Sequence, residues 1–257
     1  MMAGSIAGRL VGKRAILVGA SRGIGAECAR IMARAGAHVI LCSRDIAALE
    51  QLAAEIGLQG GRAGVAPIDL TDPGSIVAGI QSAVDQLGGL DIAVNNAGDN
   101  SARDRLIDLP LDSFDAICSV NLRGIFVAMQ QQLRVMLAQG TGGAIVNTTS
   151  ASATRAMKGM TAYVASKHGL LGLTRVAALE HAPDLIRVNC LAPGAIMTDM
   201  LRRGTVAQLG EEQLAAAIPM GRIGGAEELA QGLLWLVSDE ASYVTGINLP
   251  IDGGFSL

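Results

Sequence analysis

Short apolar segments alternate with longer alanine- and leucine-rich segments along the whole chain, and this alternation constrains the fold more than any other feature. The short segments are apolar almost throughout, as strands are when helices cover both faces of a parallel sheet. The candidate strands are residues 15–18, 39–42, 64–68, 91–94, 144–148, 186–191 and 246–249, and the candidate helices are residues 25–35, 46–56, 75–87, 111–138, 162–181 and 227–237. The pattern predicts an α/β fold with a doubly wound, mainly parallel sheet of seven strands and helices on both faces.

No linker, repeat or low-complexity tract divides the chain, so we expect a single domain over residues 1–257. The exception to regular alternation is the segment 194–225, which follows a strand. Ligands of open α/β sheets bind beyond the carboxyl ends of the strands, and long connections are usually functional. The segment is therefore a candidate substrate lid or, alternatively, an ordinary pair of surface helices. Residues 1–10 lack the apolar core of a secretory signal and no stretch resembles a membrane span, so we expect a cytoplasmic protein.

The first predicted strand runs directly into the sequence Gly19-Ala-Ser-Arg-Gly-Ile-Gly25 and then into a helix. Glycines at such a junction let the backbone turn sharply and approach a pyrophosphate, and the helix N-terminus offers free N–H groups and a positive dipole end. The spacing is G-x-x-x-G-x-G rather than G-x-G-x-x-G. Glycine-rich turns also occur for packing reasons alone, but the strand–turn–helix context favours a nucleotide site.

Ser43 and Arg44, at the end of the second predicted strand, bear on the choice of dinucleotide. An acidic residue at this place bonds the ribose 2′-OH of NAD, whereas an arginine accommodates the 2′-phosphate of NADP. Arg22 lies in the glycine turn on the same side, and two guanidinium groups can hold a phosphate. Asp45 would serve either as a ribose ligand or, as we favour, as the N-cap of the next helix. We therefore expect NADP(H), with NAD(H) possible.

Tyr163 and Lys167 lie four residues apart near the start of a predicted helix, so both side chains project from one face. A phenol has an ordinary pKa of about 10, and a nearby ammonium favours the phenolate and lowers that pKa. Tyr163 could then donate a proton to a carbonyl oxygen or accept one from an alcohol. Taken alone, a Y-x-x-x-K match is a common accident.

Further motifs accompany the glycine turn and the Tyr163–Lys167 pair, in an order and at spacings that resemble the short-chain dehydrogenase/reductase family. They are Asn95-Asn-Ala-Gly98, Asn121, Ser150 and Pro193-Gly194. The resemblance covers essentially the whole chain and implies a Rossmann-like fold and hydride transfer between NADP(H) and a ketone or secondary alcohol. Val18 departs from the pattern, since the family commonly has Thr before the first glycine.

The resemblance also implies a role for each matching residue. Ser150 would bond the substrate oxygen, and Tyr163 would be the general acid/base. Lys167 would bind the nicotinamide ribose and lower the pKa of Tyr163, while Asn121 would support a water-linked proton relay. The implied cofactor contacts are Gly19, Ser21, Arg22, Gly23, Ile24, Gly25, Ser43, Arg44, Asp69, Leu70, Asn95, Ala97, Gly98, Tyr163, Lys167, Pro193, Gly194, Ile196 and Thr198. Ordinary structural roles stay open for Asp69 as a turn or cap residue, Asn95 as a strand-end bond and Thr198 as a helix cap.

Other features narrow the partners. A net charge of -3 without a basic stripe argues against nucleic acid. No two of the three histidines are placed to share a metal, and the four cysteines form no CxxC, so we expect no metal and four buried thiols in a reducing compartment. By resemblance, helices 111–138 and 162–181 and the tail 253–257 would pair subunits in a homotetramer, with a homodimer as the alternative.

Two other functions stay open. A 3-oxoacyl-thioester reductase, acting on acyl carrier protein or CoA substrates, would need a larger basic patch than Arg123 and Arg134 provide. A non-catalytic NADP(H)-sensing protein is disfavoured because the proton-transfer residues are all present. Methionines around the candidate lid suit an adaptable apolar pocket or simply pack helices, and Arg202 and Arg203 leave room for a carboxylate.

Overall fold

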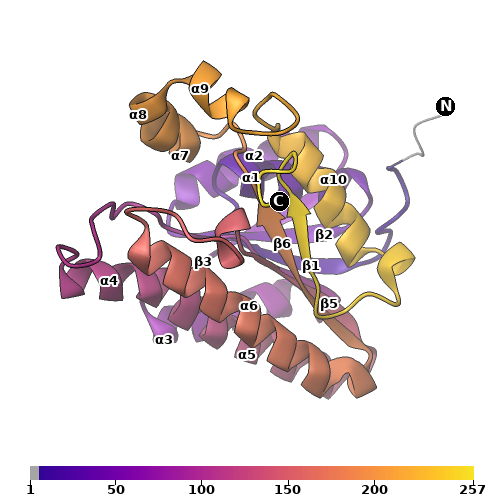
Figure 1. Ribbon diagram of the computed structural model, residues 1–257. Helices are drawn as coiled ribbons and strands as arrows, with labels where there is room; N and C mark the ends of the chain where they lie inside the picture. Colours follow the sequence, from indigo (N-terminus) through magenta and orange to yellow (C-terminus); the bar gives the residue numbers. More distant parts are fainter. Residues whose placement is uncertain (1–5) are drawn as a thin grey trace.

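The computed structural model describes residues 6–257, in which seven strands form one sheet (Figure 1). The strands are β1 (Arg14–Val18), β2 (His38–Ser43), β3 (Arg62–Pro67), β4 (Ile92–Asn95), β5 (Gly143–Thr148), β6 (Ile186–Pro193) and β7 (Asn248–Ile251). Every neighbouring pair is parallel, in the order β3-β2-β1-β4-β5-β6-β7. The winding direction reverses between β1 and β4, which confirms the predicted doubly wound, Rossmann-like fold.

Helices cover both faces of this sheet. They are α1 (Gly23–Arg34), α2 (Ile46–Leu58), α3 (Pro73–Leu87), α4 (Leu111–Cys118), α5 (Ile125–Gln139), α6 (Thr161–His181), α7 (Asp199–Leu201), α8 (Ala207–Leu209), α9 (Glu211–Ala216) and α10 (Ala226–Val237), with π-helical turns η1 (Ser119–Gly124) and η4 (Arg202–Val206) and 3₁₀ turns η2 (Ala151–Ala153), η3 (Ala182–Asp184) and η5 (Asp239–Ala241). Helices α1, α2 and α10 bury apolar side chains on one face, and α3, α5 and α6 do so on the other. Within residues 6–257, no helix combines the length and apolar composition needed to cross a bilayer.

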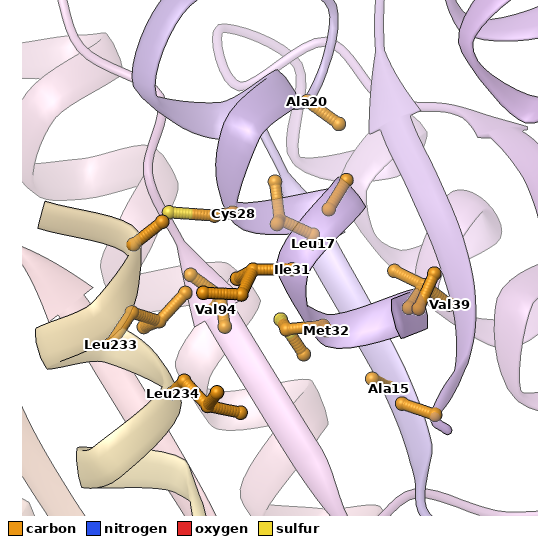
Figure 2. Packing of buried hydrophobic residues seen from close by; sticks show 14 of the residues in the cluster. Ala15, Leu17, Ala20, Cys28, Ile31, Met32, Val39, Val94, Leu233 and Leu234 are labelled. Carbon is orange, nitrogen blue, oxygen red and sulfur yellow. The ribbon is translucent and has the colours of Figure 1, made fainter. Parts of the chain in front are cut away.

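The core on the α1–α10 face shows why the strands are apolar throughout (Figure 2). Ile31 and Met32 of α1 and Leu233 of α10 pack in one cluster with Leu17 of β1 and Val94 of β4, and none of these side chains is more than 1% exposed. Each such burial contributes roughly 1.5–3 kcal/mol relative to an exposed side chain. Neighbouring residues of the same strands, such as Val18 on β1, point into the opposite core, so no alternation with polar residues arises.

The predicted helix at residues 111–138 is helical throughout, but it is interrupted by the π-helical turn η1 between α4 and α5. The interruption contains Asn121, whose side chain exchanges two hydrogen bonds with the Asp99 backbone: Nδ2 donates to the carbonyl at 2.8 Å and Oδ1 accepts from the N–H at 2.7 Å. Single π-turns inside α-helices are frequent at functional sites. The wider turn accompanies this attachment of the helix to the loop after β4.

The last strand begins two residues later than predicted. Gly246 has a positive φ of 76° and donates its N–H to the Val188 carbonyl at 2.8 Å, so it belongs to the turn that leads into the strand. Asn248 is the first residue paired with β6, opposite Cys190. The strand predicted at residues 246–249 is therefore present, but its boundaries were predicted two residues too early.

The cysteines follow the expected pattern with one exception. Cys28, Cys42 and Cys190 are buried free thiols, but Cys118 is only half-buried at the end of α4, contrary to the expectation for all four. Burial raises the pKa of the Cys42 thiol to about 12. The three buried thiols therefore behave as small apolar residues at neutral pH.

Candidate active site

The glycine turn lies at the carboxyl end of β1 and is fastened to both neighbouring strands. Gly19 donates its N–H to the Cys42 carbonyl of β2 at 2.7 Å, and Ala97 donates its N–H to the Val18 carbonyl at 3.1 Å. Gly19 and Gly23 have positive φ angles of 86° and 57°, a conformation that favours glycine. The turn therefore lies in the crevice between β1 and β4, where the strand order reverses and open α/β sheets bind ligands.

The same turn fits the diphosphate of a dinucleotide. A Cβ at Gly19 would lie 2.5 Å from the Ala97 nitrogen, and one at Gly25 would collide with the Gly19 carbonyl oxygen, so the backbone surface is open only because these residues are glycine. Helix α1 begins at Gly23 without a side-chain cap on its N–H groups. Uncapped N–H groups at a helix N-terminus bind anionic phosphate oxygens. Ser21 and Ile24 lie half-buried within this turn.

Asn96 is a site residue that the sequence-based assignment left out. Its Nδ2 donates to the Gly19 carbonyl at 3.1 Å, and its Oδ1 accepts from Oγ1 of Thr148 at 3.1 Å. The Asn96 amide thus links the glycine turn to the end of β5 through two hydrogen bonds. The second Asn of the Asn95-Asn-Ala-Gly98 motif was the available signal, because a polar residue directly after a buried strand lies at the ligand-binding edge.

Asn95 has a different place from the one expected. It is fully buried; its Nδ2 donates to Gln132 Oε1 at 3.0 Å and to Asn147 Oδ1 at 2.9 Å, and its Oδ1 accepts from Gln132 Nε2 at 2.8 Å. Asn147 in turn donates to Thr174 Oγ1 at 2.9 Å. The network joins β4 and β5 to α5 and α6, which is the structural alternative for Asn95, and it uses both N–H donors of this amide inside the core. Ala97 and Gly98 of the motif do line the crevice edge, half-buried.

At the end of β2, Ser43, Arg44 and Asp45 are arranged as one capped turn. The Asp45 carboxylate accepts the Ala48 N–H at 3.2 Å, which confirms Asp45 as the N-cap of α2. The Ser43 hydroxyl accepts the Asp45 N–H at 3.1 Å. Arg44 and Arg22 are both exposed, and neither forms an ion pair with another of residues 6–257.

Asp69 and Leu70 follow β3 at the same edge of the sheet. The Asp69 carboxylate accepts from the N–H and the hydroxyl of Thr71 at 2.9 and 2.8 Å, and these bonds, together with the Arg44 charge, hold its pKa below the ordinary value. Asp69 thus stabilises a turn, which was the structural role left open for it beside cofactor contact. Leu70 is buried in the core below.

The segment after β6 closes the crevice from the other side. Pro193 ends the strand and is buried, and a Cβ at Gly194 would lie 2.6 Å from the Asp252 Cα, so only glycine fits there. Ile196 is buried and bridges to Gly224. Thr198 caps α7 by accepting the Leu201 N–H at 3.3 Å. A helix cap was the structural role left open for this residue beside cofactor contact. A Cβ at Gly23 would touch the Thr198 methyl group at 3.4 Å, so the glycine turn and this segment are neighbours.

Ser150, Tyr163 and Lys167 come together beside this crevice. Ser150 follows β5 and acts to lower the pKa of the Tyr163 phenol, while its Oγ accepts the Ser152 N–H at 3.1 Å. Tyr163 is in the first turn of α6, and Lys167, one turn later, places Nζ 5.6 Å from the centre of the Tyr163 ring. Lys167 is buried and donates from Nζ to the Thr148 carbonyl at 2.7 Å.

The pKa values of the pair depart from the expected pattern. Burial raises the pKa of the Tyr163 phenol above its ordinary value, while the Ser150 hydrogen bond and the Arg103 charge act in the opposite direction. Burial lowers the pKa of Lys167 to about 8. Lys167 is not among the groups that lower the pKa of Tyr163 in this structure, because an amine with a pKa of about 8 is already neutral in the pH range where a phenol titrates. Tyr163 is protonated at pH 7, as a proton donor must be.

Asn121 connects these residues to the loop after β4. Besides its two bonds to Asp99, its Nδ2 lies 3.2 Å from the Ser166 hydroxyl, and Ser166 donates to the Tyr163 carbonyl at 2.8 Å. A Cβ at Gly98 would lie 3.4 Å from Lys167 Nζ and 3.5 Å from Asn121 Oδ1. The bare backbone of Gly98 therefore borders both side chains.

The segment 194–225 contains two short helical stretches, the first over residues 199–209 with a π-helical middle and the second over residues 211–216. It forms α7, η4, α8 and α9, grouped beyond the carboxyl ends of the strands (Figure 1). Its two ends are joined: Met197 donates its N–H to the Gly224 carbonyl at 2.9 Å, and Gly224 donates its N–H to the Ala195 carbonyl at 3.0 Å. Among residues 6–257, no group of His, Cys, Asp and Glu side chains is arranged to hold a metal ion.

Comparison with known proteins identifies the family. A family model described as enoyl-(acyl carrier protein) reductase matches residues 19–256. The chain is 40% identical to the short chain dehydrogenase/reductase astE of Aspergillus oryzae, with 96% of each chain covered, and 35% identical to the cyclohexanol dehydrogenase of Acinetobacter sp., with 95% of each covered.

A solved structure agrees with these relatives. The 3-ketoacyl-(acyl-carrier-protein) reductase of Brucella melitensis, complexed with NADH, superposes with a TM-score of 0.89 at 32% identity, covering 96% of this chain and 100% of that one. The glycine turn, the Ser150–Tyr163–Lys167 group and the sheet order thus accompany similarity over nearly the full length. The chain belongs to the short-chain dehydrogenase/reductase family of oxidoreductases.

Proposed function

We propose that this protein is an NADP(H)-dependent oxidoreductase that transfers a hydride between the nicotinamide and a ketone or secondary alcohol, with Tyr163 as the general acid/base. The observation that carries the proposal is the buried Lys167, which places Nζ 5.6 Å from the centre of the Tyr163 ring and 2.7 Å from the Thr148 carbonyl, at the same sheet edge as the glycine turn. Residues 1–257 would act as one catalytic domain with the segment 194–225 as its lid. The expected cytoplasmic location stays a prediction.

The side chains divide the chemistry between binding and proton transfer. The bound nicotinamide would supply or accept the hydride. Ser150 would donate a hydrogen bond to the substrate oxygen, because the Ser152 N–H already uses an acceptor position of its Oγ. Tyr163, protonated at neutral pH, would give its proton to that oxygen during reduction. Lys167, with a pKa near 8, would exchange the replacement proton through a water supported by Asn121.

The experiment that tests this function follows the absorbance of NADPH with a panel of ketones and diketones, with NADH run in parallel. We expect consumption of NADPH that depends on the ketone. If the protein binds NADPH tightly but consumes neither cofactor with any panel member, the sensing role gains support. If neither cofactor binds, the assignment of the glycine turn is wrong.

Arg44 is expected to set the preference for NADP(H). It is exposed beside the glycine turn, its charge reaches Asp69, and Asp45 is engaged as the α2 cap instead of standing free for a ribose. Arg44→Ala should weaken NADPH binding about 10- to 100-fold, the range for one charge-assisted hydrogen bond, and NADH binding less than about threefold.

A fluorescence titration with each cofactor measures this effect. Arg62→Ala is the matched control, since Arg62 is also exposed but begins β3 at the opposite edge of the sheet. Equal losses of NADPH and NADH affinity would contradict the role of Arg44. The NADH complex of the Brucella melitensis relative makes NAD(H) the alternative cofactor.

A 3-oxoacyl-thioester substrate is the second candidate, favoured by the acyl carrier protein named in the family description and in the Brucella melitensis relative. The helix faces that would receive an acidic carrier carry only scattered arginines: Arg123 donates to the Thr71 carbonyl at 3.3 Å, and Arg134 is exposed on α5. Activity on acyl-carrier substrates well above that on simple ketones would favour this candidate.

We also propose a homotetramer, with a homodimer as the alternative. An open hollow of about 650 Å³ lies along α4, η1, α5 and α6, lined by Leu122, Phe126 and Leu173 among others, and Val176 is exposed on α6. Light scattering should return about four times 26.3 kDa. Val176→Glu should lower the assembled mass, whereas Leu58→Glu on the other face should not; a monomer mass for the wild-type protein at micromolar concentration would contradict the assembly.

A further inference from the structure

Arg103 lies in the loop between β4 and α4 and links this loop to the candidate lid. Its Nη2 donates a hydrogen bond to Oγ1 of Thr205 at 3.2 Å, and a Cβ at Gly204 would lie 3.3 Å from the same nitrogen. The side chain is half-buried, and its positive charge also acts on Tyr163. Arg103 therefore lies between the candidate general acid and the segment that would cover a substrate.

Arg103 differs from three arginines that each meet a carboxylate of another segment or turn through two hydrogen bonds. The pairs are Arg14–Asp91, Arg30–Glu55 and Arg222–Glu228. Within residues 6–257, Arg103 has no ion-pair partner, and the Thr205 hydroxyl uses only one of the five N–H donors of a guanidinium. The remaining N–H donors of this guanidinium are available to an anion, and a planar guanidinium matches the geometry of a carboxylate.

We propose that Arg103 is a specificity-determining residue that binds a carboxylate of the substrate, so that oxo acids and hydroxy acids are preferred over neutral ketones and alcohols of the same size. The inference rests on the proposed function and names its substrate class. A planar guanidinium binds a carboxylate through two parallel hydrogen bonds, which would also fix the distance of the reacting carbon from Tyr163. Since Arg103 holds Thr205 at the same time, the bound acid would tie the lid to the loop.

A purely structural role for Arg103 makes a different prediction. If the side chain only fastens the lid, it does so through its one hydrogen bond within residues 6–257, to the Thr205 hydroxyl, and removing that hydroxyl should reproduce the loss of the guanidinium. Thr205→Val deletes the hydrogen bond and keeps the charge. Arg103→Met deletes both and keeps an unbranched side chain of similar length, so the two variants separate carboxylate binding from lid fastening.

The experiment compares 2-, 3- and 4-oxo carboxylates with their methyl esters, because each pair differs in charge and little else. The wild-type protein should show a higher kcat/KM for at least one acid than for its ester. Arg103→Met should lower kcat/KM for that acid about 10- to 100-fold, mainly through KM, and change the ester less than about threefold. Thr205→Val should change acid and ester by the same factor, and Arg103→Lys should retain part of the preference.

Three results would overturn the inference: esters preferred at every chain position, equal losses of acid and ester in Arg103→Met, or a Thr205→Val variant that reproduces Arg103→Met. If Arg103→Met still turns over the esters, the proposed oxidoreductase function stands whatever the acids show. Failure of the carboxylate inference can therefore be told apart from failure of the proposed function. If no panel member is turned over, calorimetric titration of the NADP⁺-loaded protein with the corresponding hydroxy acids decides. Binding by the wild-type protein that is lost in Arg103→Met supports the inference, and equal or absent binding refutes it.

Discussion

A Tyr163→Phe variant should bind NADPH as the wild-type protein does and turn over ketones about 10²- to 10⁴-fold more slowly, the contribution of one positioned general acid. The substitution removes the phenol oxygen and keeps the ring that packs near Lys167 Nζ, so the fold and the crevice should persist. The loss should appear in kcat, because the proton is needed at the reacting oxygen and not for holding the cofactor. Steady-state kinetics and a fluorescence titration of NADPH measure the two quantities separately.

Tyr243→Phe is the matched control, since Tyr243 is the chain's other tyrosine and is fully exposed. It should leave turnover and NADPH binding unchanged. Turnover by Tyr163→Phe within about tenfold of the wild-type rate would assign the proton to another donor, because a positioned acid contributes more than that. Loss of NADPH binding together with turnover would instead make Tyr163 a structural or cofactor-binding residue.

The fold could be predicted because the strands are buried on both faces. Strands β1 and β4, which contain Leu17 and Val94, carry mostly apolar residues. The glycine turn shows where the first strand meets a helix. The end of the sheet was harder to place. Gly246 precedes β7 in a turn with positive φ, and glycine is tolerated in a strand pattern and in a turn alike, so the sequence leaves the boundary open.

The site was only partly predictable, because side-chain partners depend on contacts between distant segments. Tyr163 and Lys167 share one helix, so their proximity follows from spacing alone. The amide of Asn95 turns into the core and that of Asn96 toward Gly19, yet the two adjacent asparagines look alike in sequence. Arg103 carries no signal of its own, since its neighbour Thr205 is a hundred residues away. The charge of a loop arginine is usually solvated, and only the half-buried position of Arg103 in the fold makes it distinctive.

Gly25→Ala should nearly abolish NADPH binding and lower the stability of the protein. A Cβ at this position would collide with the Gly19 carbonyl oxygen and lie 2.7 Å from Asn96 Nδ2. The first of these is a backbone atom, so the glycine turn itself would have to move, and overpacking of this kind costs about 1–3 kcal/mol. Because the turn and the first turn of α1 form one binding surface, a shift of the Gly19 peptide would also displace the groups that meet the diphosphate.

Gly57→Ala separates the local clash from the general effect of adding a methyl group. Gly57 lies in α2, and nothing within 4 Å would touch its Cβ, so this variant should gain roughly 0.5–1 kcal/mol in the free energy of unfolding through helix propensity. Urea unfolding without cofactor should therefore move in opposite directions for the two variants, while only Gly25→Ala loses NADPH in the titration. Near-normal NADPH affinity in a folded Gly25→Ala protein would contradict the assignment of the diphosphate to the glycine turn.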